Sequence, residues 1–346
     1  MTRFVRRKST VDVVIPCYNY GRFLPACAAS VLGQQDVDVR ALIIDDASSD
    51  ETPDVARELG RRNTRILYRR HESNHGHIAT YNEGLDWAEA EFVMILSADD
   101  GLAPGALSRA ALVMNSHPEV GFTYGRQLVF QSAWPDVAAL PDVSWRIVPG
   151  TTLIESACES AQNPVPTPTA VVRTSVHRIV GGYRKELPHT ADLELWLRLA
   201  AHGSIGILDA VQAVKRSHER NMQLRYVETA LPDLVQRHEA FESFFQTYDA
   251  TANLDRLAAA ARGQLAREAF WNASRAFDRG DLAMCERLLV FAVRLDPHLL
   301  DRREWSRLKW KRRCGPVVWT VLRPVIESVR RSGQAAAASS TPSARL

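Results

Sequence analysis

The stretch Phe92-Val-Met-Ile-Leu-Ser-Ala-Asp-Asp100 decides the fold of this chain. Its five apolar residues in a row predict a short buried strand, and two adjacent carboxylates follow after a pair of small residues. Burial of two neighbouring carboxylates is costly unless a cation meets them. Asp99 and Asp100 therefore indicate a charged site at the end of the strand. The alternative is that both residues cap the helix that Pro104 opens.

Three further strands are expected upstream, and they recur every 24 to 30 residues with helical patterns between them. Such alternation predicts βαβ units and a parallel sheet, in which ligands bind outside the carboxyl ends of the strands. The upstream strands are Val11 to Pro16, Ala41 to Ile44 and Arg65 to Tyr68. Polar residues follow three of the four strands at that edge, and their convergence favours a binding site: Tyr18 and Asn19, Asp45 and Asp46, Asp99 and Asp100.

The middle of the chain, from Gln127 to Pro168, has no clear periodicity, and its Trp and Pro residues predict loops and short extended pieces. Pro164-Val-Pro-Thr-Pro168 is expected to be extended, because each proline disfavours a helical conformation in the residue before it. Thr169 to Arg173 then predicts another strand.

Ala191 to Ala201 predicts a helix that carries Asp192 and Glu194 in its first turn. The helix dipole alone favours carboxylates at that place. One of the two could instead act as a general base. Further on, Lys215-Arg-Ser-His218 suits either a phosphate-binding loop or a solvated run of charges, and the residues alone favour the solvated run.

From Tyr226 onward the pattern is helical, and Ala266 to Leu299 predicts a helical hairpin packed on the catalytic domain, with Gly280-Asp281 at its turn. The segment from Arg302 to Arg331 carries a net charge of +8, interleaved with tryptophans. This composition suits an anionic membrane surface, or a helix packed on the protein whose cations reach solvent. Residues 332–346 are expected to be disordered.

The composition of the 346 residues is that of an ordinary globular protein, with 46% hydrophobic and 24% charged residues and a net charge of only +3. Five cysteines without CxxC spacing indicate neither a disulfide framework nor a zinc site, which suits a cytoplasmic setting. The basic N-terminus lacks the apolar core of a signal peptide, and no stretch approaches the ~20 apolar residues of a spanning helix. No nucleic-acid partner is expected.

The order of the motifs resembles the family-2 glycosyltransferases, and this resemblance runs from about Val11 to about Tyr226. It implies the GT-A fold, an α/β fold with a Rossmann-like, mostly parallel sheet and flanking helices. A C-terminal helical region would follow. The expected domains are a basic extension (1–10), the GT-A domain (11–225), a helical region with a basic, Trp-containing tail (226–331) and the disordered end (332–346). The motifs are Val14-Ile-Pro-Cys-Tyr-Asn19, Ile44-Asp-Asp-Ala-Ser-Ser-Asp-Glu-Thr52, Asn74-His-Gly76 with Asn82, Leu96-Ser-Ala-Asp-Asp100, Gly181-Gly-Tyr183 and Asp192-Leu-Glu-Leu-Trp-Leu-Arg198.

The resemblance implies an inverting transfer of a sugar from a nucleotide-sugar donor, a UDP- or dTDP-sugar, to an acceptor hydroxyl. The acceptor would be a glycan or a lipid-linked glycan of the cell envelope, reached from the cytoplasm or the inner face of the membrane. The implied donor-binding residues are Pro16, Tyr18, Asn19, Asp45, Asp46, Asn74, Gly76, Asn82, Asp99 and His218. Asp99, Asp100 and His218 would hold Mg²⁺ or Mn²⁺, and Asp192 would be the catalytic base.

Two departures from the family pattern bear on these roles. Ser97 stands where the first Asp of an Asp-Ala-Asp-Asp motif is usual, which leaves Asp99 as the expected metal ligand. Ala191 replaces the Glu of a Glu-Asp pair, so Glu194 remains a rival to Asp192. Two alternatives stay open: a non-catalytic GT-A scaffold that acts through its C-terminal helices, and a nucleotidyltransferase, against which the missing Gly- and Arg-rich loop after the first strand counts.

Overall fold

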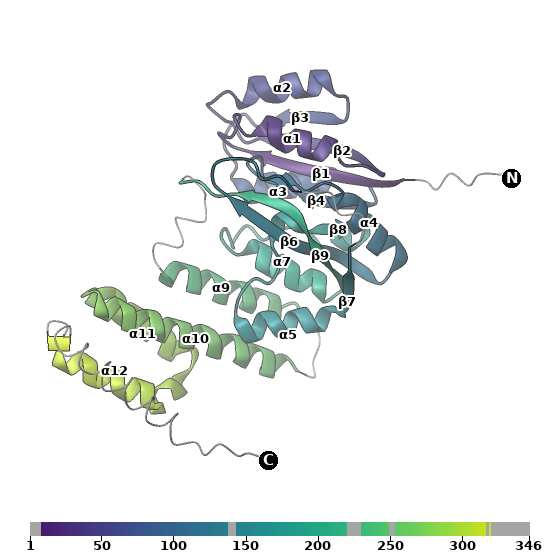
Figure 1. The fold of residues 1–346 in the computed structure, drawn as a ribbon. Coiled ribbons are helices and arrows are strands. Elements are labelled where there is room, and N and C mark those ends of the chain that lie inside the picture. The colour runs from purple at the N-terminus through teal and green to yellow at the C-terminus, as the bar shows by residue number, and fades with distance from the viewer. Residues whose placement is uncertain (1–7, 138–142, 220–229, 249–252, 316–317, 320–346) are drawn as a thin grey trace, which may run out of the picture. The chain divides into compact units, whose positions relative to one another are not determined.

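The computed structural model describes residues 8–137, 143–219, 230–248, 253–315 and 318–319. It has the predicted α/β fold, a mixed sheet with a parallel half and flanking helices, followed by a helical C-terminal region (Figure 1). Two compact units divide the chain: residues 1–229 with 235–261, and residues 230–234 with 262–346. The expected disordered segment 332–346 lies outside the described residues.

The four predicted strands form the parallel half of the sheet in the order β3-β2-β1-β4. Cys17 pairs with Asp45, so the ends of β1 and β2 lie side by side. Their bounds are Ser9–Cys17 (β1), Val37–Asp45 (β2), Ile66–Arg70 (β3) and Phe92–Ile95 (β4).

The other half of the sheet reverses direction twice and so returns to the direction of β4. Strand β8 is antiparallel to both β4 and β6, and β6 is parallel to β9. The carboxyl ends of β6 and β9 therefore lie at the same edge as those of β1, β2 and β4. The bounds are Gly101–Leu102 (β5), Val120–Phe130 (β6), Trp145–Pro149 (β7), Val171–Arg173 (β8) and Ser204–Arg216 (β9).

Helices cover both faces of this sheet because its strands are apolar on both sides. Val13 and Ile15 of β1 join a core with residues of the helices on one face, while Val14 points to the other face. There a Cβ on Gly84 would lie 2.1 Å from Val14 Cγ1, so only glycine allows this close approach. The helices are α1 (Leu24–Leu32), α2 (Thr52–Arg62) and α4 (Ala106–Ser116) on the first face, and α3 (His77–Trp87), α6 (Thr174–Val180) and α7 (Ala191–Ala200) on the second.

The expectation of loops between Gln127 and Pro168 is wrong in part, because helix α5 occupies Gly150–Ser160. Its buried residues Leu153, Ile154, Ala157 and Cys158 follow helical spacing, and flanking prolines and tryptophans hid that pattern. The proline-rich segment is not extended throughout, since Thr167–Thr169 forms the 3₁₀ turn η1.

The described helices after the sheet begin at Ala230, and α9 and α10 each pass from one unit to the other. The predicted hairpin turn at Gly280-Asp281 is present, and the Asp281 side chain caps the next helix at Met284 N. Lys311 anchors α12, with its Nζ 2.5 Å from Asp278 Oδ1. The bounds are Ala230–Phe245 (α9), Leu254–Asp278 (α10), Leu282–Leu295 (α11), Pro297–Asp301 (η2) and Arg303–Cys314 (α12).

Candidate active site

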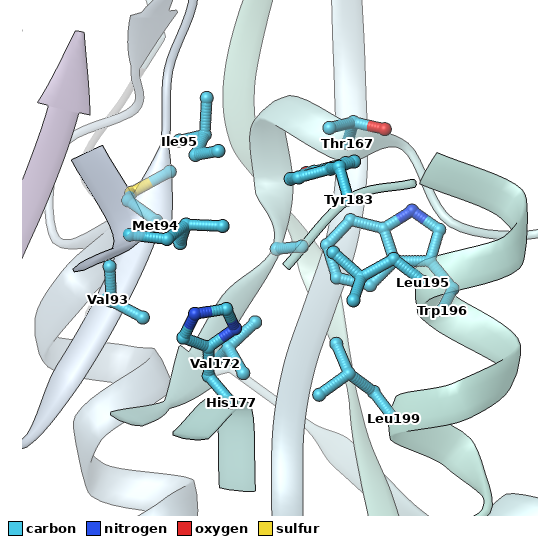
Figure 2. Close-up of a pocket in the computed structure, with 12 residues that line it drawn as sticks. Val93, Met94, Ile95, Thr167, Val172, His177, Tyr183, Leu195, Trp196 and Leu199 are labelled. Carbon is cyan, nitrogen blue, oxygen red and sulfur yellow. The ribbon is translucent and has the colours of Figure 1, made fainter. Parts of the chain in front are cut away.

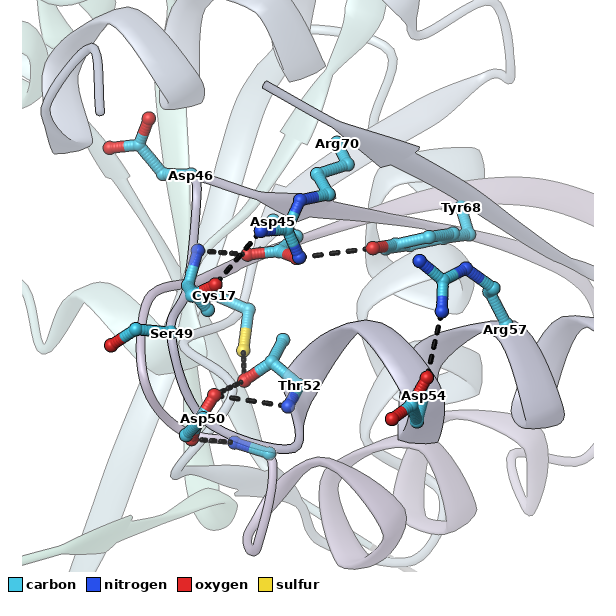
Figure 3. A network of polar contacts seen from close by, with 12 residues as sticks. Cys17, Asp45, Asp46, Ser49, Asp50, Thr52, Asp54, Arg57, Tyr68 and Arg70 are labelled. Carbon is cyan, nitrogen blue, oxygen red and sulfur yellow. Dashed lines mark hydrogen bonds and ion pairs between the residues drawn. The ribbon is translucent and has the colours of Figure 1, made fainter. Parts of the chain in front are cut away.

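Asp45, at the end of β2, is fully buried and organises the loop that follows it (Figure 3). Its Oδ1 accepts from Ser48 N at 2.8 Å, and its Oδ2 accepts from Arg70 Nη1 at 3.0 Å and Tyr68 OH at 3.1 Å. These contacts occupy both carboxylate oxygens. Asp45 therefore supports the site from within the protein.

Asp46 points away from that network (Figure 3). Its carboxylate accepts from the backbone N–H groups of His75 at 2.7 Å and Gly76 at 2.9 Å, and Asn74 Nδ2 donates to its carbonyl at 3.2 Å. The structure thus brings together Asp46, Asn74 and Gly76, which come from two separate sequence motifs.

His71 completes this group, and the sequence motifs did not single it out. Its ring nitrogens lie 2.7 Å from Asp46 Oδ1 and 2.6 Å from Glu83 Oε2, and its ring stacks on His75. Burial lowers the pKa of His71, but hydrogen bonds to Asp46 and Glu83 outweigh burial and raise it above its usual value. His71 directly follows β3, a strand parallel to β2, so its place in the sequence was a signal that it lies at the carboxyl edge of the sheet.

The acidic pair that ends the opening motif is almost entirely buried at the same sheet edge. Asp100 Oδ1 accepts from Arg216 N at 2.9 Å, and Asp99 Oδ2 lies 3.1 Å from His218 Nε2. Burial, together with the charge of Asp99, raises the pKa of Asp100 to about 8. Helix α4 begins only at Ala106 with Gly105 as its cap residue, so the helix-capping alternative is wrong.

The run Lys215-Arg-Ser-His218 is not a solvated charge run, contrary to what the residues alone favour. The Arg216 guanidinium lies between the rings of Phe23 and Phe130, 4.6 and 4.5 Å from their centroids. The His218 ring packs against Phe23 and Tyr20 at 5.4 Å from each. Aromatic packing therefore holds the end of β9 beside the acidic pair.

Asp192 lies in the first turn of α7, and residues from the uninterpreted middle of the chain hold it. Its Oδ2 accepts from Asn163 Nδ2 and from Thr167 Oγ1, both at 2.9 Å, and its Oδ1 accepts from Leu193 N at 2.8 Å. Burial raises the pKa of Asp192, and the Thr167 hydrogen bond opposes that rise. The prolines around Thr167 were the only sequence signal of this rigid support.

Tyr81 is within electrostatic range of both Asp192 and the acidic pair. Burial raises the pKa of the Tyr81 hydroxyl, and the charges of Asp192, Asp99 and Asp100 add to that rise. All three carboxylates are therefore within electrostatic reach of one phenol. Two acidic motifs that lie 92 residues apart in the sequence thus act on the same side chain.

Glu194 has a different environment, although it is only two residues from Asp192. It is fully buried, accepts from Arg198 Nε at 2.8 Å and Nη2 at 2.8 Å, and accepts from Arg184 Nε at 2.6 Å. Arg198 also donates to the carbonyls of Val180 and Gly182. Two guanidinium groups thus enclose the Glu194 carboxylate and hold the turn before α7.

Of the remaining predicted site residues, Asn19 and Asn82 form hydrogen bonds between separate segments, and Tyr18 is exposed to solvent. Asn19, with φ 58°, bonds Ser48 and Ser49 and so joins the ends of β1 and β2. Both amide atoms of Asn82 bond the backbone of Tyr183, at 2.7 and 2.9 Å. Pro16 lies within β1. Tyr18 is 49% exposed and is accessible to a ligand.

A small apolar cavity lies between β4 and α7 (Figure 2). Side chains such as Val93, Leu195 and Leu199 line it, and Thr167 forms part of its wall. The buried Trp196 Nε1 at this cavity has no hydrogen-bond partner within the described part of the chain. The lining is that of an interior packing gap.

Within the residues that the structure describes, no group of three or more His, Cys, Asp or Glu side chains could by itself hold a metal ion. Asp99 and Asp100 nevertheless offer two buried carboxylates. The pKa of Asp100 is raised by burial and also by the charge of Asp99, and a cation would offset that repulsion. Mg²⁺ is commonly bound by one or two carboxylates together with substrate phosphates. The residues therefore fit a divalent cation that a bound diphosphate helps to hold.

Residues 12–179 match the family model described as Glycosyl transferase family 2. The chain is 27% identical over 218 residues to "Uncharacterized protein MT1568" of Mycobacterium tuberculosis, which is 60% of this chain and 67% of that protein. It is 32% identical over 120 residues to the GalNAc(5)-diNAcBac-PP-undecaprenol beta-1,3-glucosyltransferase of Campylobacter jejuni, 34% of this chain and 38% of that enzyme. The second match spans well under half of the relative.

Two solved structures share the fold. The S. aureus TarS fragment 1–349 in complex with UDP-GlcNAc has a TM-score of 0.63 at 16% identity, covering 94% of this chain and 92% of TarS 1–349. The mannosyltransferase PcManGT from Pyrobaculum calidifontis, in complex with GDP-Man and Mn²⁺, has a TM-score of 0.52 at 16% identity, covering 86% and 89%. At these identities the likeness extends to the fold alone.

Proposed function

Because this chain belongs to glycosyl transferase family 2 through its residues 12–179, we propose that it transfers a sugar from a nucleotide-diphosphate sugar to an acceptor hydroxyl with inversion. The observation that carries this proposal is the buried pair Asp99 and Asp100, which Arg216 N and His218 hold at the carboxyl edge of the sheet. The charges of this pair and of Asp192 all act on Tyr81. In such a site the acidic pair can help to bind the diphosphate, and Asp192 can serve as the catalytic base.

Asp192 is the proposed base. Two hydrogen bonds occupy its Oδ2, which leaves lone-pair capacity on Oδ1 for the acceptor proton. The acceptor oxygen bonds the anomeric carbon as the bond to the diphosphate breaks, the proton goes to Asp192, and the electron pair leaves with the diphosphate. A single displacement of this kind inverts the anomeric centre. Proton acceptance contributes about 10² to 10⁴ in rate.

Glu194 is a poor candidate for the same role. Its contacts with Arg184 and Arg198 favour the charged carboxylate and cover its oxygens. A base must be within hydrogen-bond reach of the acceptor, and Glu194 is fully buried. Its proposed role is to hold the turn that precedes Asp192.

Mg²⁺ or Mn²⁺ is the proposed cofactor, held by Asp99 and Asp100. Such an ion offsets the charge that develops on a leaving diphosphate. His218, now beside Asp99, would turn to the diphosphate or the metal. The bound Mn²⁺ of the fold neighbour PcManGT is in keeping with this proposal.

The donor and acceptor are proposed as classes. Asp46, Asn74 and Gly76, which hydrogen bonds hold together at the end of β2, would form the base pocket for a UDP- or dTDP-sugar, because a few fixed polar groups can orient a planar base. A glycan or lipid-linked acceptor of the cell envelope is proposed because one relative is named for a PP-undecaprenol-linked substrate.

Helix α12 supports a peripheral site of action at an anionic membrane. Among the described residues, Arg303, Arg307, Lys309 and Arg313 are exposed and make no ion pair, and Trp310 is 51% exposed beside them. Lys311 and Arg312 instead pair with Asp278 and Glu286. Cations around an exposed tryptophan suit anionic headgroups. No helix in the described part of the chain could span a bilayer.

The non-catalytic scaffold remains the second candidate, and Ser97 and Ala191 are the observations that favour it. Against it stands the support that Asn163 and Thr167 provide for Asp192, which a scaffold does not need. A titration of UDP and dTDP with and without Mn²⁺, followed by turnover of the matching sugars, tests the proposal. Absence of UDP and dTDP binding in both conditions would rule out a transferase that uses these donors. Binding without turnover of any donor would favour the scaffold.

A further inference from the structure

Trp134 lies beside the acidic pair, although it comes from the stretch after β6 that carries no recognisable motif. An ideal Cβ on Gly101 would lie 2.2 Å from Cη2 and 2.5 Å from Cζ2 of Trp134. The six-membered edge of the indole thus rests on the backbone of the residue directly after Asp100. Only glycine at position 101 leaves room for it.

The Trp134 ring is held in place by a layered set of side chains. It contacts Phe130 edge-to-face at 5.4 Å. Phe130 in turn covers the guanidinium of Arg216. The backbone N–H of Arg216 donates to Asp100. This chain of contacts fixes the indole relative to the carboxylate, and little side-chain entropy remains to be lost when a ligand binds.

Trp134 is packed on one side only, and 39% of the residue remains open to solvent. Single exposed apolar residues are common on proteins and carry no argument by themselves. Trp134 differs from Trp145, which is 42% exposed but pairs with Leu208 in the middle of β9, away from the strand ends. Trp134 instead combines exposure, immobilisation and contact with the residue after Asp100.

An indole face presents negative π density. The C–H groups on one face of a pyranose ring are weakly polar, and their hydrogens carry small positive partial charges. Sugar rings therefore stack on aromatic faces, while their hydroxyl groups find polar partners nearby. Asp99, Asp100 and His218 provide such partners at this edge.

We propose that the exposed face of Trp134 is a stacking surface for a pyranose ring at the transfer site. The proposal rests on the proposed function and adds a sugar-contacting residue to it. The ring could belong to the donor or to the acceptor, and the experiment below separates these sources.

The first arm measures the binding of nucleotides and nucleotide sugars by calorimetry in the presence of Mn²⁺. The ligand pairs are UDP with UDP-GlcNAc or UDP-glucose, dTDP with dTDP-glucose, and GDP with GDP-mannose. The proteins are the wild type, Trp134→Ala, Trp134→Phe and the control Trp145→Ala. A donor-sugar contact predicts that W134A weakens the nucleotide sugar about tenfold and leaves the free nucleotide unchanged. W134F should retain most of the affinity.

The second arm uses methyl glycosides of glucose, galactose and N-acetylglucosamine with UDP and Mn²⁺ present. An acceptor-sugar contact predicts saturation-transfer signals from one ring face that disappear in W134A and persist in W145A. If both arms are unchanged in a folded W134A protein that still binds nucleotide, the stacking role is wrong. If the wild type binds no nucleotide, the proposed function itself fails.

Discussion

Thr167 donates a hydrogen bond to Oδ2 of Asp192 over 2.9 Å, and it does so from a turn between two prolines. This contact opposes the rise that burial causes in the Asp192 pKa. It therefore connects the motif-free middle of the chain to the protonation state of the proposed base.

Replacement of Thr167 by Val should move the acid limb of the pH–rate profile to higher pH. A base acts only when deprotonated, and loss of the hydrogen bond raises its pKa further. The measurement is kcat/KM against pH for any donor that the wild type turns over. Thr190→Val, which removes a hydroxyl bonded to the Gln236 carbonyl, serves as the control. An unchanged limb, or one at lower pH, would contradict the role of Thr167.

Asp192→Asn should mainly lower the transfer rate, whereas Glu194→Gln should mainly lower the free energy of unfolding. Asp192→Asn is expected to bind nucleotide normally and lose 10²-fold or more of the transfer rate. Glu194→Gln weakens a buried ion-pair network, which costs about 3–5 kcal/mol when a partner charge is removed. Urea unfolding and single-turnover rates of both variants provide the comparison. Transfer that survives in Asp192→Asn would remove it as the base.

The acidic pair should make the protein less stable as pH rises. The folded pKa of Asp100 is raised to about 8 from 3.8, so between these values the folded state binds more protons than the unfolded state, and the free energy of unfolding falls with pH. Asp100→Asn keeps an oxygen that can accept from Arg216 N but cannot titrate. Near pH 8 its free energy of unfolding should therefore have fallen less than that of the wild type, by roughly 1–3 kcal/mol.

Mn²⁺ together with UDP should restore stability to the wild type at pH 8, by about 2.7 kcal/mol at 100-fold excess over Kd. Thermal unfolding across pH 5 to 9, with and without these ligands, measures both effects. Identical pH dependence of the wild type and Asp100→Asn would show that Asp100 does not titrate in this range.

Removal of the exposed arginines of α12 should weaken binding to anionic vesicles. The triple variant Arg303→Ala, Arg307→Ala and Arg313→Ala loses about 1 kcal/mol per charge near the surface, or roughly 100-fold in partitioning. Sedimentation with phosphatidylglycerol vesicles at low and high salt measures it, since screening weakens such attraction.

The matched control for α12 is a triple variant of α2, Arg57→Ala, Arg61→Ala and Arg62→Ala. It removes the same charge from a helix of the unit formed by residues 1–229 and 235–261. If both triple variants lose binding equally, net charge rather than α12 determines the association. Equal binding of the wild type and the α12 variant would remove the membrane role of this helix.

Gly101→Ala should destabilise the protein because the new methyl group meets the Trp134 ring. The cost is expected at about 1–3 kcal/mol, and Trp134→Ala in the same chain should recover part of it. A double-mutant cycle by urea unfolding measures the coupling. Additive effects of the two substitutions would mean that this contact does not form.

The sequence by itself predicted the parallel half of the sheet, because buried strands and their amphipathic helices follow local periodicity. It also indicated that Asp46 and Asp99 lie at one edge, since parallel strands end together. Helix α5 escaped prediction because flanking prolines and tryptophans obscured the spacing of Leu153, Ile154 and Ala157.

Only the tertiary structure separated Asp192 from Glu194, and only it brought Trp134 to Gly101. Residues two positions apart in a helix point in different directions, so one carboxylate meets Thr167 while the other meets two arginines. Trp134 reaches Gly101 because β6 returns to the direction of β4 after two antiparallel steps. Local patterns determine which segments form strands and helices, but side-chain partners depend on how distant segments pack.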